Sequence, residues 1–586
     1  MAFQVSPGVN VSEIDTTTVV PAVSTSVGAI VGNFQWGPVN SPVLVSSEVE
    51  LVDKFGKPND DTAVDFLTAA NFLSYSNALR VLRAAPAGAY NATSRNDVSV
   101  QYKDETDYFN DGDYDTGIAS ATDENKFNFA ARYPGALGNS LKVEVWANSN
   151  TSLFSSWAYA PLFDTIPGTS NYVSVNHNSS AKDEMHIVVV DEDGAITGKA
   201  NTVLERFGYL SKATNAKDES GQSLYYKEVL LRKSKWIYWA GHPNTDVQIT
   251  GSGAGAWGVA ANATHTFGDI IDNSGADKVG NSVFSLVGGV DAAVTSTEIQ
   301  VGYDNIKNSE NVDISLILTA AQDATSQEYA VNTVCETRKD CVAFVSPPLT
   351  DCLSSTAVDD VVSWRNDDLN ISSSYGVADS GWKYQYDKYN DEYRWVPLNG
   401  DVAGLCARTD NDRDPWFSPA GFNRGQIKNV VKLAFNPNKA ARDELYKAGV
   451  NPVVSFPGEG TVLFGDKTML GRPSAFDRIN VRRLFIVLEK AISRASRSSL
   501  FEFNDEFTRA QFVNLVEPFL RNVQGRRGIY DFRVVCDETN NTLEVIDRNE
   551  FVGDIYVKPA KSINFIQLNF VAVRTGVSFE EIVGRV

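Results

Sequence analysis

The stretch from residue 451 to 561 has the most regular pattern in this chain, and it constrains the fold most strongly. After Pro473, apolar residues recur at helical spacing, and a second helical stripe begins at Thr508, which forms a capping-box pattern with Gln511. The first stripe contains Val481, Leu484, Phe485, Leu488 and Ile492, and the second contains Phe512, Leu515, Val516, Phe519, Leu520 and Val523. Each helix has one apolar side that must be covered by another element.

The spacing changes to that of a β-strand after the second helix. Tyr530, Phe532 and Val534 alternate with polar neighbours, and further strands are predicted over Thr542–Ile546 and Asp554–Val557. These elements predict a C-terminal α+β module, residues 421–562, in which two helices pack on a small antiparallel sheet.

Two separated segments, residues 21–90 and 285–420, predict one discontinuous α/β core domain, because strands and helices alternate in both. Strands are expected over Val27–Val31, Pro42–Ser46, Leu79–Leu82, Val312–Leu318 and Val342–Val345, and helices over Ala63–Tyr75 and Ser326–Lys339. The intervening residues 91–284 are rich in Asn, Ser, Thr, Gly, Asp and Tyr, with short apolar runs. They predict an outward β-rich insertion of one or two subdomains. The fold class is therefore mixed α+β and multi-domain.

Both ends of the chain carry strand-like runs that have no neighbouring partner strand. In the N-terminal segment, residues 1–20, the strand pattern is formed by Val9, Val11, Glu13 and Ile14. In the C-terminal segment, residues 563–586, it is formed by Phe565, Leu568, Phe570, Val577 and Phe579. A lone strand cannot satisfy its own backbone hydrogen-bonding groups. Each segment is therefore either a frayed terminus or an arm that adds to another sheet.

The sequence contains no recognisable catalytic or cofactor-binding motif, so no enzyme activity, cofactor or metal is predicted. The stretch Gly460–Thr468 departs from a phosphate-binding loop because Asp466 separates Gly465 from Lys467. The four histidines show no metal-ligand spacing, and the five cysteines form no C-x-x-C pair. The formal net charge of −21 argues against non-specific binding to nucleic acid or to an anionic membrane, and no apolar run is long enough for membrane insertion.

Arginine and lysine residues are concentrated in the C-terminal module, against the acidic background of the whole chain. Arg482, Arg483, Arg494 and Arg497 belong to the first predicted helix or to the residues that follow it. Such residues either form a solvated face with local carboxylate partners or bind an acidic protein partner.

The chain resembles the contractile tail sheath proteins of T-even-like bacteriophages. The resemblance rests on the order and spacing of short motifs that extend over both ends of the chain. In the first half these are Ser6-Pro7-Gly8-Val9 with Glu13, Gly32, Gly37-Pro38, Pro42, Phe55-Gly56, Val81-Leu82-Arg83 and Val287-Gly288-Gly289-Val290-Asp291. In the second half they are Arg338-Lys339-Asp340, Val402-Ala403-Gly404, Arg408-Thr409-Asp410, Asn451-Pro452, Gly458–Gly465, Asn480-Val481-Arg482-Arg483, Phe501-Glu502-Phe503-Asn504 and Asn541-Thr542. Residues 91–280 lie outside the resemblance.

The resemblance implies a structural subunit that stacks as hexameric rings in a helical array and contracts to drive a tail tube through the host envelope. The implied partners are other copies of the chain, the tail tube protein, and the baseplate and tail terminator proteins. The protein would be made and assembled in the host cytoplasm and would reside in the virion. The two terminal arms would exchange strands between subunits and complete the C-terminal module, and Arg482, Arg483, Arg494 and Arg497 would face the tube.

Two other functions are compatible with the residues alone. One is a glycan-binding or adhesin-like structural protein with the β-rich insertion as its binding part. Separately, the Tyr and Trp residues at 382–395 could stack on sugars, although such clusters more often pack between a sheet and its neighbour. The other is an enzyme whose site has no recognised motif. Negative-stain electron microscopy of the purified protein distinguishes these functions. A sheath protein should form rings or long tubes and an adhesin monomers or closed oligomers that retain sugar, whereas an enzyme could have any assembly state.

Overall fold

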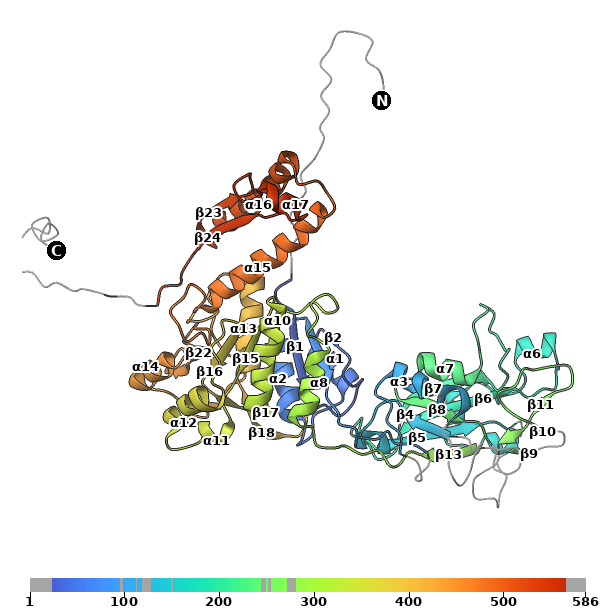
Figure 1. Ribbon diagram of the computed structural model, residues 1–586. Coiled ribbons are helices and arrows are strands. Elements are labelled where there is room, and N and C mark those ends of the chain that lie inside the picture. Colours follow the sequence, from blue (N-terminus) through green and yellow to red (C-terminus); the bar gives the residue numbers. More distant parts are fainter. Residues whose placement is uncertain are drawn as a thin grey trace, which may run out of the picture. The chain divides into compact units, whose positions relative to one another are not determined.

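The computed structural model describes residues 24–94, 99–111, 113–117, 128–148, 151–243, 249–250, 254–270, 281–564 and 567 (Figure 1). The chain divides into two compact units. The larger contains residues 22–415 and 419–490, and the smaller contains residues 416–418 and the chain from 491 onward. In the described part of the chain, no helix combines the length and the apolarity that a membrane span requires.

A seven-stranded sheet forms the centre of the larger unit. Its strand order is β2-β3-β1-β14-β15-β16-β20, and every pair is parallel except β2 with β3. The strands are β1 (Gly28–Gly32), β2 (Val43–Val45), β3 (Leu79–Arg83), β14 (Leu316–Leu318), β15 (Val342–Val345), β16 (Gly376–Asp379) and β20 (Val450–Asn451). Most of their residues are apolar and buried, as expected for parallel strands covered on both faces. The two predicted core segments therefore meet in one sheet.

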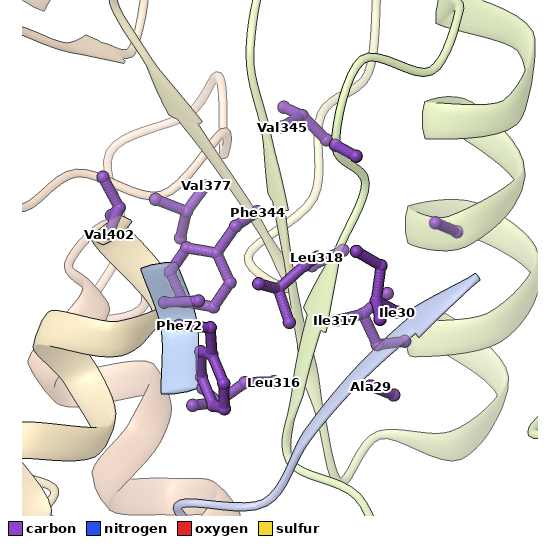
Figure 2. Close-up of a cluster of buried hydrophobic side chains, with 14 of the residues drawn as sticks. Ala29, Ile30, Phe72, Leu316, Ile317, Leu318, Phe344, Val345, Val377 and Val402 are labelled. Atoms are coloured by element: carbon purple, nitrogen blue, oxygen red, sulfur yellow. The ribbon is translucent and has the colours of Figure 1, made fainter. Parts of the chain in front are cut away.

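Helices cover both faces of this sheet. They are α2 (Ala63–Leu73) and α13 (Asn399–Asp412) on one face, and α8 (Ser296–Asp304) with α9 (Ala324–Glu328) and α10 (Glu336–Arg338) on the other, α9 and α10 being joined by a π-helical turn over Tyr329–Cys335. Phe72 of α2 and Val402 of α13 lie on the same side of the strands as Phe344 (Figure 2). On the opposite face α8 lies close to β1, because a Cβ atom on Gly302 would be 2.4 Å from Cγ1 of Val31.

The remaining elements of the core follow the sequence pattern closely. Ser47 caps the helix that begins at Glu48, its side chain accepting a hydrogen bond from the Glu50 backbone, and Gly56 ends it with a φ of 79°. The helices are α1 (Glu48–Phe55), α11 (Leu349–Cys352), α12 (Ala357–Ser363) with a π-helical extension over Trp364–Asp368, and α14 (Lys439–Lys447). The strands are β17 (Trp382–Asp387), β18 (Glu392–Pro397), β19 (Lys432–Leu433), β21 (Val453–Phe456) and β22 (Gly460–Leu463).

The described residues between 91 and 285 contain many short strands. Four of them form an antiparallel sheet of order β13-β5-β6-β7, and β4 pairs with β8. The strands are β4 (Asn128–Ala131), β5 (Leu141–Trp146), β6 (Glu184–Asp191), β7 (Thr202–Ser211), β8 (Ile237–Gly241), β9 (Ile249–Thr250), β10 (Ala254–Gly255), β11 (Thr266–Phe267), β12 (Asp269–Ile270) and β13 (Asn281–Ser285). The helices are α3 (Glu105–Asn110), α4 (Asp113–Thr116), α5 (Thr151–Phe154), α6 (Asn171–Asn176) and α7 (Tyr226–Lys233), with 3₁₀ turns over Ala136–Ser140 and Ala160–Leu162.

The smaller unit contains a helix packed on a hairpin. Helix α15 (Ile479–Ser496) begins in the larger unit and continues into the smaller one, since the division falls between Lys490 and Ala491. The elements that follow are a 3₁₀ turn over Arg497–Ser499, α16 (Glu506–Gly525), β23 (Ile529–Val535), α17 (Leu543–Asp547) and β24 (Asp554–Pro559). Phe512 of α16 packs against Phe551, with ring centroids 5.5 Å apart.

Three expectations for the C-terminal module require correction. The boundary predicted at residue 421 lies inside the larger unit, because β20 is a strand of the core sheet and Ile479 belongs to the main core cluster. Residues 542–546 form a helical turn rather than a strand, so the sheet is a hairpin of β23 and β24. Helix α16 begins at Glu506, because Asp505 rather than Thr508 accepts the capping hydrogen bond. Its last residue is Gly525.

Candidate assembly interfaces

The hairpin of β23 and β24 is a sheet with two open edges in the described part of the chain. The two strands pair antiparallel from Val535 opposite Asp554 to Ile529 opposite Pro559, with a register shift between Ile529 and Asp531. A two-stranded sheet is only marginally stable, and each open edge carries unpaired backbone donors and acceptors that another strand can bind. This hairpin is therefore a candidate to accept a strand.

The smaller unit also exposes several large apolar side chains near the start of α16. Phe501, Phe503 and Phe507 are 105%, 84% and 76% exposed, and Leu500 and Leu543 are 62% and 79% exposed. The Asn504 side chain donates hydrogen bonds to the Asn541 side chain (3.1 Å) and to the Glu550 carbonyl (2.9 Å), which fixes this loop beside α17. Apolar exposure on this scale is typical of a surface that a partner covers.

The strand-like residues predicted at the two chain ends lie outside the described residues. This holds for the N-terminal set Val9, Val11, Glu13 and Ile14. It holds equally for the C-terminal set Phe565, Leu568, Phe570, Val577 and Phe579. The role of both sets as arms remains a prediction.

Two of the four arginines predicted to face a partner are buried. Arg482 is 5% exposed, and its guanidinium lies over the rings of Tyr375 and Phe476, at 4.5 and 4.6 Å from their centroids. Arg483 is 3% exposed and forms an ion pair with Asp410 at 2.5 Å. The expectation that these two residues form an exposed basic face is therefore corrected: their charges are neutralised inside the larger unit.

Arg494 and Arg497 have the opposite environment. Both are exposed, and both belong to the smaller unit, at the end of α15 and in the turn after it. They precede Leu500 and Phe501 in the chain by a few residues, so a basic segment runs directly into the exposed apolar one. The structure separates the four predicted arginines into a buried pair and an exposed pair.

The described residues offer no arrangement of groups that indicates catalysis. No group of three or more His, Cys, Asp or Glu among them could hold a metal ion. The stretch that resembled a phosphate-binding loop begins with β22, which pairs with β21 in a hairpin. All five cysteines are buried, and burial raises the pKa of the Cys406 thiol to about 12. The aromatic residues of β17 and β18 pack on one another, with the Tyr384 and Tyr393 rings stacked at 5.6 Å.

Comparison with known proteins connects these features to one family. Three family descriptions match the chain: "Tail sheath protein Gp18 domain III N-terminal region" over residues 25–84, "Phage tail sheath protein central domain" over 292–469, and "Phage tail sheath C-terminal domain" over 472–572. None of these ranges includes the β-rich insertion.

Curated relatives match over nearly the whole length. The chain is 36% identical to the tail sheath protein of Vibrio phage KVP40 and 35% identical to that of Enterobacteria phage T4, covering 99% of both proteins in each comparison. Among solved structures, the sheath tail protein from Listeria innocua matches 92% of this chain and 96% of its own length, with a TM-score of 0.52 and 12% identity, which supports the fold alone. This chain therefore belongs to the phage tail sheath protein family.

Proposed function

We propose that this protein is the subunit of a contractile phage tail sheath, in which copies stack as hexameric rings in a helical array around the tail tube. Contraction of the array drives the tube through the host envelope for genome ejection. The near-complete alignment with two phage tail sheath proteins is the observation that carries this proposal. The tail tube, baseplate and tail terminator proteins are the proposed partners, with assembly in the host cytoplasm and a final location in the virion.

The terminal arms are proposed to link neighbouring subunits by strand exchange. The hairpin of β23 and β24 offers open edges, and the chain has two strand-like segments without local partners, around Val9–Ile14 and Phe565–Phe579. An added strand gains backbone hydrogen bonds at about 0.5–1.5 kcal/mol each, so one arm alone binds weakly. A contact between different surfaces of two copies propagates into a helical array, in which many weak links act together.

Deletion of residues 1–20 tests this role of the arms. The core sheet and the helices that cover it are built from residues after Val27, so the truncated chain should remain folded and soluble, with an unchanged circular dichroism spectrum. Negative-stain microscopy should show tubes or rings from the full chain and only separate subunits from the truncated one. Normal tubes from the truncated chain would contradict the proposal.

The exposed basic segment of Arg494 and Arg497 is proposed to face the tube, in place of the four-arginine face expected from the sequence. Its charge suits an acidic partner surface, and the adjacent apolar residues Phe501 and Phe503 supply area that a partner can cover. The double variant Arg494→Glu/Arg497→Glu should reduce capture of the tube protein at low salt, with a smaller difference at high salt because exposed charges are screened.

A matched control separates this effect from a general change of charge. Arg521 and Arg548 lie elsewhere on the smaller unit, are 70% and 58% exposed, and pair with Glu517 and Glu550. Arg521→Glu/Arg548→Glu changes the net charge by the same amount and should leave tube capture close to that of the unaltered protein. Equal losses in both double variants would refute a specific tube contact at Arg494 and Arg497.

A further inference from the structure

The four residues that precede β1 are held by hydrogen bonds although they belong to no strand. This segment, Ser24–Val27, is where the chain enters the described core after the N-terminal segment. All four of its carbonyl groups accept hydrogen bonds from the core. The donors are the Ser315 side chain to Ser24 (3.3 Å), Arg483 to Thr25 (3.4 Å), the Ser76 side chain to Ser26 (3.1 Å) and the Ser315 backbone to Val27 (2.9 Å).

The buried ion pair of Arg483 and Asp410 is the centre of this arrangement. The Thr25 hydroxyl donates to the Asp410 carboxylate at 2.6 Å, and Arg483 donates to the same carboxylate oxygen at 2.5 Å. Arg483 also donates to the Cys406 carbonyl of α13 at 3.2 Å. Thr25 is 7% exposed, so these groups are shielded from water. Removing either partner of such a pair is strongly destabilising, because the other would remain as an uncompensated buried charge.

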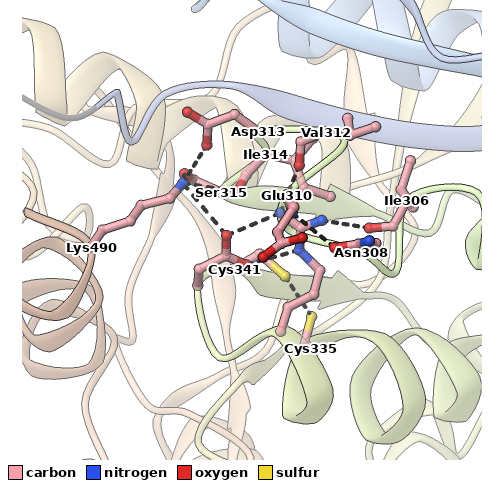
Figure 3. Close-up of polar contacts among 12 residues, drawn as sticks. Ile306, Asn308, Glu310, Val312, Asp313, Ile314, Ser315, Cys335, Cys341 and Lys490 are labelled. Atoms are coloured by element: carbon pink, nitrogen blue, oxygen red, sulfur yellow. Dashed lines mark hydrogen bonds and ion pairs between the residues drawn. The ribbon is translucent and has the colours of Figure 1, made fainter. Parts of the chain in front are cut away.

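Lys490 of α15 holds the same segment indirectly through Ser315. Its ammonium group donates to the Asp313 carboxylate at 2.6 Å, to the Ile314 carbonyl at 3.2 Å and to the Ser315 hydroxyl at 3.1 Å (Figure 3). Ser315 in turn contacts Ser24 and Val27. One helix, α15, therefore supports the segment at two positions seven residues apart, Arg483 directly and Lys490 through Ser315.

We propose that Arg483, with Asp410 and Thr25, is a positioning clamp that fixes where the N-terminal arm leaves the core. The clamp also transmits a force on the arm to α15. This inference rests on the proposed exchange of arms between subunits. Arg483 acts on assembly through the segment Ser24–Val27 and need not touch a neighbouring copy. If the clamp is lost, residues 24–27 are released from the core and lengthen the connection between the arm and the core, so the arm samples a larger volume.

The loss of the clamp lowers the effective concentration of the arm at its binding edge without changing the arm itself. A longer connection between the arm and the core also transmits no displacement of the arm to the core until that connection is fully extended. The same helix α15 continues from the larger unit into the smaller one, so the clamp connects the arm to the element that leads to the C-terminal hairpin.

Comparison of Arg483→Met with Arg482→Met tests the clamp, because the two arginines are adjacent on α15 and both are buried. Arg482 contacts Tyr375, Phe476 and Glu489. Within the described part of the chain, it donates no hydrogen bond to residues 24–27. Hydrogen exchange of the peptide spanning residues 22–31 should rise at least tenfold in Arg483→Met and less than threefold in Arg482→Met. The critical concentration for tube formation should rise at least tenfold only in Arg483→Met.

Thr25→Val is a gentler variant that removes the hydroxyl donor and keeps the ion pair. It should fold even if Arg483→Met does not, and it should raise both exchange and critical concentration about threefold. Equal behaviour of Arg482→Met and Arg483→Met, or an unchanged Thr25→Val protein, would overturn the clamp. The deletion of residues 1–20 separates the two proposals: if it abolishes tubes while the clamp variants assemble normally, only the clamp is wrong. Normal tubes from the deletion would refute the arm exchange itself.

Discussion

The buried ion pair between Lys383 of β17 and Asp401 of α13 should be a major determinant of the stability of the larger unit. Neither side chain is more than 1% exposed, and the Lys383 ammonium lies 2.8 Å from the Asp401 carboxylate. Lys383 also donates to the Lys428 carbonyl at 2.9 Å, and the Tyr75 hydroxyl donates to Asp401 at 3.0 Å. The pair thus joins α13 to the three-stranded sheet of β17, β18 and β19.

The variant Lys383→Met removes one charge and keeps most of the side-chain volume. At the observed 2.8 Å the Coulomb attraction is about 6 kcal/mol with an effective dielectric constant of about 20, and the cost of burying both charges offsets much of it. Removing Lys383 alone leaves the Asp401 carboxylate buried, with a hydrogen bond from the Tyr75 hydroxyl in place of an ion pair. The free energy of unfolding should therefore fall by about 3–5 kcal/mol.

Guanidinium unfolding followed by circular dichroism measures this change. The exposed pair of Lys388 and Glu48 supplies the control, since the Lys388 side chain is 59% exposed and Lys388→Met should cost less than about 1 kcal/mol. The double variant Lys383→Met/Asp401→Leu should recover most of the loss, because no buried charge remains. A loss in Lys383→Met no larger than that in Lys388→Met would refute the reasoning.

Two further variants test the core. Burial raises the pKa of Asp379 from 3.8 to about 8, so between these pH values the folded protein keeps a proton that the unfolded chain releases. The contribution of Asp379 to the unfolding free energy is therefore full below about pH 4 and falls by about 1.4 kcal/mol per pH unit until about pH 8. Asp379→Asn should flatten the fall in unfolding free energy measured between pH 5 and 8, and an unchanged slope would count against this assignment. Gly302→Ala should lower the unfolding free energy by about 1–3 kcal/mol despite the better helix propensity of alanine, because its Cβ would lie 2.4 Å from Cγ1 of Val31. Val301→Ala is the control, because Val301 is 45% exposed. Equal unfolding midpoints for the two variants would refute the predicted clash, because they would show that α8 shifts away from β1 without a loss of stability.

The elements of the core could be predicted because their signals are local. The cap at Ser47, the buried strand around Ile30 and the helix that begins at Ala63 each follow from neighbouring residues. Thr542–Ile546 misled the prediction because its β-branched residues favour a strand, whereas the structure folds it as a helical turn next to Asn541. The Asn541 side chain accepts a hydrogen bond from the Val552 backbone at 2.9 Å, a contact that local propensity does not contain.

The burial of Arg482 and Arg483 could not be predicted from the helix that carries them. Both lie beside the apolar stripe, where a solvated position and a buried ion pair produce the same local pattern. For each arginine one partner is distant in sequence: Asp410 is 73 residues from Arg483, and Tyr375, which contacts Arg482, belongs to the loop before β16. The exposed pair, Arg494 and Arg497, lies beyond Lys490, the last residue of the larger unit in this part of the chain. The proposed exchange of strands between copies of the chain leaves one local signal in the sequence, namely strand-like residues that have no neighbouring partner strand.

A cryo-electron microscopy map of tubes assembled from the full chain would show directly where the two strand-like ends bind. We expect the segments around Val9–Ile14 and Phe565–Phe570 to pair with the hairpin of β23 and β24 in neighbouring copies. The backbone from Ser24 to Val27 should keep its contacts with Ser315 and Arg483. Tubes in which both ends fold onto the sheet of their own subunit, with no strand from a neighbour, would contradict the proposed exchange.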